Sequence, residues 1–367
     1  METVAITGGC GVVGRFVARR LCENANVEEI RIIDRSAERP ESHPKIRYIQ
    51  LDLTGNDADL DRALQGVTAV VHTAKADLPL IYQSKEDLTQ MWMDNVDATE
   101  RLIERMLAKK IRRLVYVGDA YSALPVDDNF GLSEDIHRGL PGSFLLGEWG
   151  ESRTRAELLA RKAAEKDNSL DAIFLRPTWV YSEIPSSFWK GLKSLVDSDQ
   201  LPYTPGPRRG LHQFMYAGNL AKTIEDCVFF LKADPQKYSN ELVYLTDNTY
   251  VASFIDFLKE RTGGEHLSQE TPFWTAFFRT LYPHLSRACG MPQEGRLHFQ
   301  TWRAIFEKVI GFCDKKARLL LNFKPETPPT IAMARSLEMF KAKEIIVDLP
   351  IHKKLGVQRS LRRGAYA

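Results

Sequence analysis

The sequence predicts an α/β protein with a doubly wound parallel sheet and a smaller, mostly helical C-terminal lobe. Over roughly the first 180 residues, short runs rich in β-branched residues alternate with helical patterns. These runs are almost continuously apolar, as expected for strands that are buried on both faces of a sheet. A glycine-rich segment joins the first run to the first helical pattern. Together these features favour a parallel sheet with helices on both faces.

Six runs are expected to be strands of this sheet, and two later segments are expected to return to it. The six are TVAIT (3–7), IRIID (30–34), IRYIQLDL (46–53), TAVVHTA (68–74), RRLVYVG (112–118) and LDAIFLRPT (170–178). The two later segments are HQFMYAGNLAKTI (212–224) and ELVYLTD (241–247). Between the early runs lie helical stripes, such as the apolar residues of 12–21 and of 102–107.

These elements define the expected domains. A nucleotide-binding domain is predicted over 1–181, and residues 211–260 return to it. Residues 182–210, which carry several prolines and lose the alternating rhythm, are expected to form a loop-rich part of a substrate lobe together with 261–330. A C-terminal helix and a basic tail are predicted over 331–367.

Two aromatic stripes and the tail are candidates for contact with an apolar ligand or a membrane. The first stripe lies within 271–289, after Thr271 as N-cap and Pro272 in the first turn. The second consists of Trp302, Ile305, Phe306, Val309 and Ile310. Core packing is the default for both stripes, and a lid or an interfacial anchor is the alternative. From Lys341 onward, seven Lys/Arg and two acidic residues give the tail a charge of +5, which suits either a solvated tail or contact with anionic lipid.

Composition restricts the class of protein. The net charge of +2 gives no reason to expect binding to nucleic acid. The sequence contains no run of 18 apolar residues, so a membrane-spanning helix is not expected. The five cysteines form no CxxC pair and are odd in number, so they are expected to be free thiols in a reducing compartment. A strand pattern begins at once, which leaves no room for a signal peptide. We therefore expect a cytoplasmic protein, with peripheral contact on an intracellular membrane left open, and no metal site.

The segment TGGCGVVGRF predicts a dinucleotide site. Gly8 permits a tight turn, Gly11 lets the backbone approach a pyrophosphate, and Gly14 lets helix and strand pack closely. Asp34 stands at the end of the second strand, where a carboxylate binds the ribose 2′-hydroxyl of NAD and repels a 2′-phosphate. Arg35 could accept that phosphate, so NADP is the less favoured alternative to NAD. A nucleotide fold whose site is no longer used is the other alternative.

Further segments resemble a known family in order along the chain. TGGCGVVG matches the T-G-x-x-G-x-x-G of extended short-chain dehydrogenases/reductases, and LDLT with Asp52 resembles the adenine-contacting segment. VVHTAK (70–75) is similar to the family's HxAA stretch, and Asn95 lies in DNVDATERLIE, close to NVxGTxxLLE. LRPTWVYS (175–182), MYAGNLAKTI and FCDKKARLLLNFKP (312–325) resemble LRPxxVYG, VYVxNVAxAH and FSxxKAxxxLGFxP.

The wording of these segments is closest to the 3β-hydroxysteroid dehydrogenase/isomerase branch. That resemblance implies the Rossmann fold, NAD as cofactor, and oxidation of a 3β-hydroxysteroid or related alcohol. It also implies a small apolar ligand and a homodimer formed through helices near 85–109 and 148–165. The implied cofactor contacts are Gly8, Gly11, Val12, Val13, Gly14, Asp34, Arg35, Asp52, Leu53, His72, Thr73, Ala74, Asn95, Arg153 and Pro177.

The segment GEWGESRTRAE (147–157) departs from the family at its catalytic helix. The family's helix reads Y-x-x-S-K-x-x-A-E, where Tyr and Lys are catalytic. Aligning Ser152, Ala156 and Glu157 places Trp149 at the tyrosine and Arg153 at the lysine. The strand motif Y-T-S-S appears as Y-V-G-D, so Asp119 takes the place of the catalytic serine.

These exchanges are unfavourable for the family's chemistry. The tyrosine must pass a proton to or from the substrate oxygen, whereas an indole N–H does not ionise near pH 7. An ionised Asp119 would repel a developing alkoxide, and Arg153 has no acid beside it to tune. One interpretation is an Arg153–Asp119 salt bridge, with Trp149 filling the vacated space.

Two hypotheses follow, and whether the chain is an enzyme stays open between them. In the first, the chain binds NAD(H), and turnover is weak or lost. In the second, it is an active NAD(P)-dependent oxidoreductase on a sterol-like or other apolar alcohol. A water molecule or Tyr121, two residues after Asp119, would then carry the proton.

Overall fold

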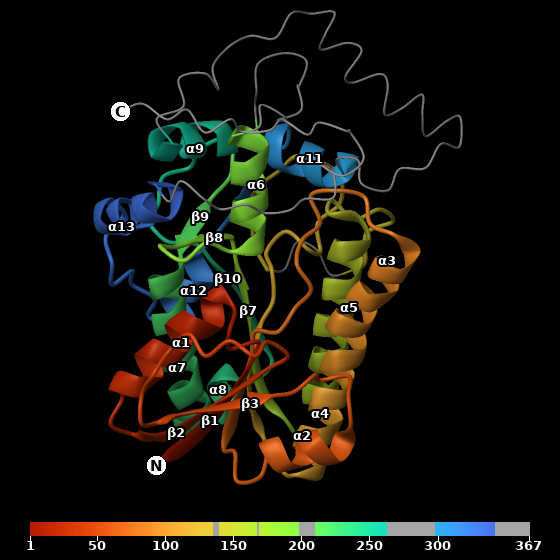
Figure 1. Ribbon diagram of the computed structural model, residues 1–367, viewed down its shortest axis with the longest axis vertical. Coiled ribbons are helices and arrows are strands. Elements are labelled where there is room, and N and C mark those ends of the chain that lie inside the picture. The colour runs from red at the N-terminus through yellow and green to blue at the C-terminus, as the bar shows by residue number, and fades with distance from the viewer. Residues whose placement is uncertain (135–138, 167–168, 198–209, 263–297, 342–367) are drawn as a thin grey trace, which may run out of the picture.

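The sheet at the centre of the protein has seven parallel strands (Figure 1). The computed structural model describes residues 1–134, 139–166, 169–197, 210–262 and 298–341. The strands are β1 (Glu2–Thr7), β2 (Val27–Asp34), β3 (Ile46–Gln50), β4 (Ala69–His72), β5 (Arg113–Val117), β7 (Asp171–Pro177) and β10 (Glu241–Leu245). Their order is β10-β7-β5-β4-β1-β2-β3. The chain therefore winds outward from β1 in both directions, and the predicted doubly wound sheet is confirmed.

Helices cover both faces of the sheet (Figure 1). One face carries α1 (Val12–Glu23), α7 (Ala217–Ala233) and the short α8 (Pro235–Tyr238). The other carries α2 (Asp57–Ala63), α3 (Lys85–Trp92), the π-helical turn η1 (Met93–Asp97), α4 (Ala98–Ala108) and α5 (Gly147–Glu165). Strand β1 divides its side chains between two apolar cores, with Val4 and Ile6 in one and Ala5 in the other. This division is the reason that the strands are apolar at nearly every position.

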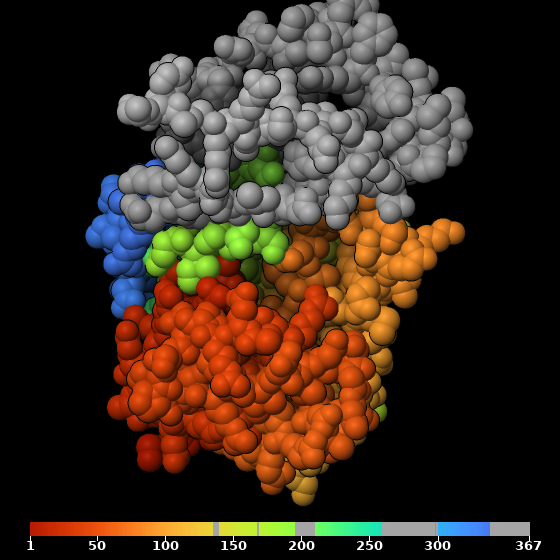
Figure 2. All heavy atoms as spheres, viewed as in Figure 1, coloured from red at the N-terminus to blue at the C-terminus, as the bar shows by residue number. Residues whose placement is uncertain are grey.

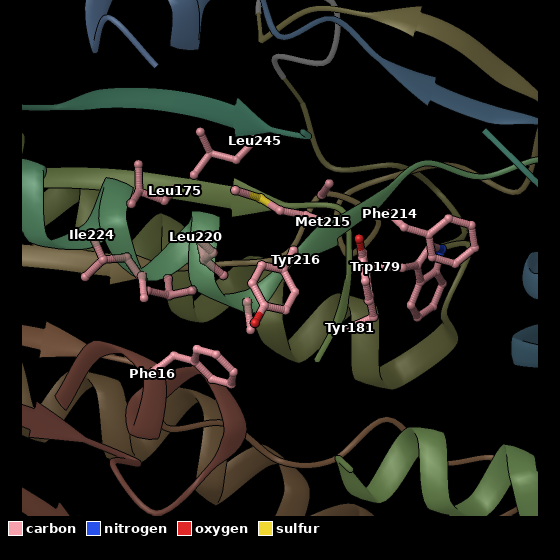
Figure 3. Packing of buried hydrophobic residues seen from close by; sticks show 14 of the residues in the cluster. Phe16, Leu175, Trp179, Tyr181, Phe214, Met215, Tyr216, Leu220, Ile224 and Leu245 are labelled. Carbon is pink, nitrogen blue, oxygen red and sulfur yellow. The ribbon is translucent and has the colours of Figure 1, made fainter. Parts of the chain in front are cut away.

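The apolar stripe of α1 faces α7. Phe16 packs edge-on against Tyr216, with ring centroids 5.9 Å apart, and Leu220 and Ile224 of α7 belong to the same buried cluster (Figure 3). The predicted helical spacing of the residues in 12–21 is thus realised as one buried face.

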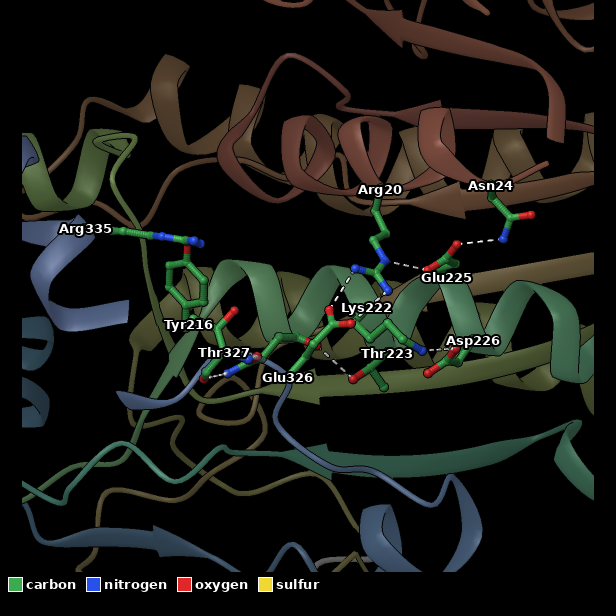
Figure 4. A network of polar contacts seen from close by, with 11 residues as sticks. Arg20, Asn24, Tyr216, Lys222, Thr223, Glu225, Asp226, Glu326, Thr327 and Arg335 are labelled. Carbon is green, nitrogen blue, oxygen red and sulfur yellow. Dashed lines mark hydrogen bonds and ion pairs between the residues drawn. The ribbon is translucent and has the colours of Figure 1, made fainter. Parts of the chain in front are cut away.

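A polar network fixes the same two helices at their exposed edge (Figure 4). The guanidinium of Arg20 donates to the Glu225 carboxylate at 2.7 Å, and Asn24 donates to the other oxygen of that carboxylate at 2.7 Å. Arg20 also binds Glu326, in the segment that follows α12 (Lys315–Leu320). The network therefore ties the first helix to chain segments more than 200 residues away.

A smaller lobe lies beyond the sheet. It contains the pairs β8 (Trp179–Tyr181) with β9 (Phe214–Tyr216) and β6 (Asn129–Leu132) with β11 (Ile310–Phe312). Its helices are α6 (Ser187–Asp197), α9 (Phe254–Thr262), α11 (Phe299–Phe306), α12 (Lys315–Leu320) and α13 (Pro329–Lys341). In Figure 1, α6, α9 and α11 lie together at one end of the molecule.

Three expectations about this lobe need correction. Residues 187–197 form α6 rather than a loop, because an amphipathic pattern there outweighs the nearby prolines. Strand β9 pairs with β8 and not with the central sheet, whereas β10 does join that sheet. The second aromatic stripe is helical only through Phe306, since Ile310 begins a strand.

The expected C-terminal helix is present as α13. The aromatic stripe of 271–289 and the basic tail after residue 341 lie outside the described residues. Within the described ranges, no helix is both long and apolar enough to cross a bilayer. The four described cysteines, Cys10, Cys22, Cys227 and Cys313, are free.

Candidate functional site

A cleft of about 640 Å³ opens at the carboxyl ends of the central strands. Its floor is the glycine loop after β1, and its sides come from the ends of β2, β4, β5 and β7. The start of α6 closes it from the smaller lobe. In the space-filling view, a hollow separates the green α6 segment from the red and orange N-terminal residues (Figure 2). Ligands of open α/β sheets bind at such a position, where the strand order reverses.

The glycine loop requires its glycines for steric reasons. Gly8 has a φ of +71°, and a side chain there would approach the backbone of Ala74 to 2.6 Å. A Cβ on Gly14 would lie 2.5 Å from the Cα of Gly9, so helix α1 could not pack so closely on the loop. At Gly11 a Cβ would meet only the carbonyl oxygen of Gly8, at 3.2 Å. This leaves the N-terminus of α1 open to the cleft.

Asp34 reaches this loop from the end of β2. Its carboxylate accepts the amide of Cys10 at 2.9 Å and the amide of Ser36 at 2.9 Å. Burial and the nearby Asp34 carboxylate raise the pKa of Cys10 to about 11, so its thiol stays protonated and unreactive at neutral pH. Arg35 is turned to Asp94, with an ion-pair distance of 2.8 Å. The one group expected to accept a 2′-phosphate is therefore already paired with a carboxylate.

Most of the residues predicted to contact a cofactor line the cleft. They are Gly8, Gly11, Val12, Val13, Gly14, Asp34, Arg35, Asp52, Leu53, Thr73, Ala74 and Pro177. The side chains of His72, Asn95 and Arg153 are almost fully buried and do not line it.

His72 is a core residue. Its Nδ1 lies 2.7 Å from the Thr7 hydroxyl and its Nε2 lies 3.1 Å from the Thr99 hydroxyl. Burial, with a smaller effect of Arg153, lowers its pKa to about 3. With both ring nitrogens engaged, the imidazole cannot also bind a cofactor, and the prediction for this side chain is wrong.

Trp149 and Asn95 hold one short loop from two sides. The indole N–H of Trp149 donates to the carbonyl of Ala76 at 2.9 Å, and the amide of Ala76 donates to Asn95 Oδ1 at 2.9 Å. Asn95 in turn donates to the Ser152 hydroxyl at 2.9 Å. Asn95 lies in the π-helical turn η1, a geometry that is frequent at functional sites. Trp149 lines the cleft with its ring, and its only polar atom is used to fix the loop.

Arg153 is buried beneath the cleft. One of its terminal nitrogens donates to the carbonyl of Val117 at 2.8 Å, and the guanidinium lies 5.8 Å from the Tyr116 ring centroid. Its Nε and Nη1 have no acceptor among the described residues. Within the described part of the chain, no ion pair joins it to Asp119, so the proposed salt bridge is wrong. Trp149 is itself 2% exposed.

Asp119 lies in the cleft and Tyr121 does not. The Asp119 carboxylate accepts the amide of Tyr121 at 2.8 Å in a turn after β5. Tyr121 is 1% exposed, packs on Trp179 with centroids 4.7 Å apart, and points its hydroxyl to the Gln213 carbonyl at 3.5 Å. Burial raises the pKa of Tyr121 well above its ordinary value. A hydroxyl so placed cannot carry protons to the cleft, which corrects the prediction for Tyr121.

Lys75 was missed by the sequence reasoning. It lines the cleft, and its ammonium lies 5.7 Å from the centroid of the Trp149 ring. The side chain is exposed at the cleft, where partial desolvation and Arg153 lower its pKa while Asp119 and Asp77 act in the opposite direction. The signal was in the HTAK stretch, because Lys75 stands where the family's HxAA pattern has its last alanine.

The smaller lobe lines the cleft with aromatic side chains. Trp179 and Phe188 are stacked with centroids 5.1 Å apart, and both line the cleft together with Trp189 and Ile184. Trp189 is held by its indole N–H, which donates to the Val180 carbonyl at 2.7 Å. The smaller lobe thus presents flat apolar surfaces to a ligand.

A doubly wound sheet with this glycine loop and an acidic residue at the end of β2 defines a dinucleotide-binding α/β protein. Comparison of the sequence specifies the family. The chain belongs to the 3-beta hydroxysteroid dehydrogenase/isomerase family, whose model matches residues 5–271.

A viral relative is similar to the chain in sequence, and two solved structures are similar to it in fold. The chain is 27% identical over 232 residues to the 3 beta-hydroxysteroid dehydrogenase/Delta 5-->4-isomerase of Vaccinia virus (strain Ankara). That match covers 60% of this chain and 64%, just under two thirds, of the viral protein. MoeE5 in complex with UDP-glucose and NAD has a similar fold, with a TM-score of 0.66, 19% identity, and coverage of 92% of this chain and 98% of MoeE5. The UDP-glucuronic acid 4-epimerase of Bacillus cereus in complex with NAD gives 0.65 at 16% identity, covering 93% and 99%.

Proposed function

We propose that the chain binds NAD(H) in the cleft at the carboxyl ends of the strands. The observation that carries this proposal is the Asp34 carboxylate beside the sterically required glycine loop. The loop suits a pyrophosphate at the N-terminus of α1, and Asp34 suits an unphosphorylated ribose. The pairing of Arg35 with Asp94 further favours NAD over NADP. Bound NAD would supply a hydride acceptor, and NADH a hydride donor.

The family's usual proton relay is not available to this chain. Trp149 stands at the position of the tyrosine, Arg153 at that of the lysine and Asp119 at that of the serine. An indole cannot exchange its proton near neutral pH, and a buried arginine stays charged. General acid–base catalysis contributes about 10²- to 10⁴-fold, so we propose that turnover by the usual mechanism is weak or lost.

The ligand is proposed to be a small apolar molecule, with a steroid as the family's example. The stacked Trp179 and Phe188 support this, because flat aromatic surfaces bind flat apolar rings. The viral relatives are named as steroid dehydrogenases, but the match spans only part of their length. A cytoplasmic location, peripheral membrane contact through the tail, and a homodimer through the helices of 85–109 and 148–165 remain predictions.

The first experiment is a titration of the full chain with NADH, followed by tryptophan quenching and energy transfer to the nicotinamide. Trp149 lines the cleft, so Trp149→Tyr is expected to reduce the transfer while binding persists. Micromolar binding, tighter for NADH than for NADPH, is the expected result. If neither nucleotide binds, the proposal fails, and the glycine loop belongs to a nucleotide fold whose site is no longer used.

The triple variant Asp119→Ser/Trp149→Tyr/Arg153→Lys tests the assignment of the relay. It restores the family's residue types at the three aligned positions. If the alignment is correct, the variant gains oxidation of a 3β-hydroxysteroid with NAD relative to the unmodified chain. A variant that folds and binds NADH but gains nothing would count against these positions as the relay.

A second candidate function is an active oxidoreductase with a substitute proton donor. The observation that favours it is Lys75, an amine that stands in the cleft over the Trp149 ring. This candidate keeps the same cofactor and ligand class.

A further inference from the structure

We propose that Lys75 exchanges the proton of the substrate oxygen, in the role that the family gives to its tyrosine. The inference rests on the proposed binding of NAD(H) and deepens the second candidate function. It assigns the role to a residue from the loop after β4, and not to the catalytic helix α5.

The loop that carries Lys75 is fixed at the next residue. The carbonyl of Ala76 accepts the Trp149 indole N–H, and its amide donates to Asn95, both at 2.9 Å. Both bonds are buried, so the backbone beside Lys75 has little freedom. Trp149 therefore acts as a positioning residue: its N–H holds the loop, and its ring lies under the ammonium at 5.7 Å. A cation that lies above the face of an indole ring is attracted to it.

Three other candidates for proton exchange, Trp149, Arg153 and Tyr121, are engaged elsewhere. The indole of Trp149 keeps its proton, the guanidinium of Arg153 is buried under the cleft, and the hydroxyl of Tyr121 points to Gln213. Lys75 and Asp119 both line the cleft near the end of β5. Lys190 also lines it, from α6 in the smaller lobe. A primary amine can both give and take a proton, which a Trp or a buried Arg cannot do.

The charges around Lys75 set its protonation. Asp119 in the turn after β5 and Asp77 on its own loop favour the ammonium, whereas Arg153 on α5 and desolvation favour the neutral amine. Lys75 is exposed to solvent, so water screens these effects; the net direction is a lowered pKa, with desolvation by the cleft walls as its largest cause. Lowering brings an amine closer to the range in which a general base works near neutral pH.

The proposed role of Lys75 is to take the hydroxyl proton of the alcohol as hydride leaves its carbon. On oxidation, the alcohol carbon loses a hydride to NAD⁺ as the O–H bond breaks, and the neutral Lys75 amine takes the proton. The products are the ketone, NADH and the Lys75 ammonium, which returns its proton to the water of the cleft. Reduction of a ketone runs the same step in reverse, with the Lys75 ammonium as the donor.

The test begins with a measurement that needs no turnover. In protein labelled with carbon-13 lysine, the Lys75 Cε signal is assigned by its loss in Lys75→Arg and followed against pH. A titration below the ordinary pKa range of a lysine is expected. Lys75→Met is also titrated with NADH, and a Kd within about threefold of the unmodified chain is expected, because the lysine serves the substrate and not the nucleotide.

Turnover is then measured with cyclohexanol and a 3β-hydroxysteroid plus NAD⁺, and with the matching ketones plus NADH. We expect oxidation to rise and reduction to fall as the pH passes through the pKa of Lys75. Lys75→Met and Lys75→Arg should both lose about 10²-fold or more, since an arginine keeps the charge but cannot release a proton. Lys85→Met, on the exposed start of α3, is the matched control and should change nothing.

Each other outcome decides against the proposal. If NADH binds but no probe is converted, Lys75 is not a proton carrier, while the proposed nucleotide binding stands. Lys75 is also not the proton carrier if Lys75→Met keeps its activity, or if Lys190→Met and not Lys75→Met removes the pH dependence of turnover. If the unmodified chain does not bind NADH, both this proposal and the proposed function fail.

Discussion

The indole N–H of Trp149 donates to the backbone carbonyl of Ala76 at 2.9 Å, across 73 residues of sequence. Both groups are buried, so each would otherwise lack a partner. Trp149 is therefore a structural support for the loop that carries Lys75. Trp149 thus contacts this loop twice: its N–H holds the backbone at Ala76, and its ring lies 5.7 Å from the Lys75 ammonium.

Replacing Trp149 should cost stability as well as change the cleft. Trp149→Phe leaves the Ala76 carbonyl without its donor, which should lower the free energy of unfolding by roughly 1–3 kcal/mol. Urea unfolding followed by circular dichroism measures this. Trp92→Phe is the matched control, because its indole N–H makes only an exposed 3.4 Å contact with Glu148. Equal losses in the two variants would contradict the role given to the Trp149 bond.

Cofactor preference should depend on Asp34. Asp34→Ala removes the carboxylate that repels a 2′-phosphate. The ratio of the Kd for NADPH to the Kd for NADH should therefore fall by about tenfold or more. Adding Asp94→Ala should increase the effect, since it releases Arg35 from its ion pair. Fluorescence titration with both nucleotides gives the ratio. Glu28→Gln, at the exposed start of the same strand, should leave that ratio unchanged, and a similar shift there would indicate a mere change in net charge.

The sheet was predictable because burial on both faces leaves a direct pattern in the sequence. All six early runs are strands of the central sheet, as is ELVYLTD at β10. The pairs β6–β11 and β8–β9 were not foreseen, because three- and four-residue strands carry too few side chains to show a period. Strand β9 was wrongly expected in the central sheet, because its three residues do not show which strand it pairs with.

In the site, sequence reasoning was more successful for backbone than for side chains. Glycine positions follow from steric limits that any sequence must meet, and Gly8 and Gly14 have the expected close contacts. The directions of His72 and Tyr121 depend on partners from distant segments, Thr99 and Gln213, which no local spacing reveals. Lys75 was not predicted, because the local pattern around it does not show that the loop after β4 lines the cleft.

The glycine loop gives a sharp steric prediction. In Gly14→Ala the new Cβ would lie 2.5 Å from the Cα of Gly9 and 2.7 Å from the carbonyl oxygen of Gly8. Because both neighbours are backbone, α1 must shift away from the loop, at a cost of about 1–3 kcal/mol in stability. NADH affinity should fall at least about tenfold, since α1 presents its N-terminus to the cofactor. Gly142→Ala, whose Cβ would meet nothing within 4 Å, should bind NADH normally.

Two buried histidines should make the protein sensitive to acid. Burial lowers the pKa from 6.5 to about 3 for His72, which Arg153 also disfavours as a cation, and to about 4 for His212. Between pH 6.5 and about 4 the unfolded chain binds protons at these positions and the folded chain does not. The free energy of unfolding should therefore fall as the pH falls, by up to about 1.4 kcal/mol per pH unit for each histidine.

Urea unfolding between pH 7 and pH 4.5 tests this, with slopes compared rather than absolute stabilities. His72→Gln should reduce the slope by about one proton, even if the lost bonds to Thr7 and Thr99 also lower stability at every pH. His43→Gln is the control, because His43 is exposed and should leave the slope as it is. A slope that stays the same in His72→Gln would mean that this imidazole takes up a proton in the folded state. Its two hydroxyl partners would then have to act as acceptors for a charged ring in the core.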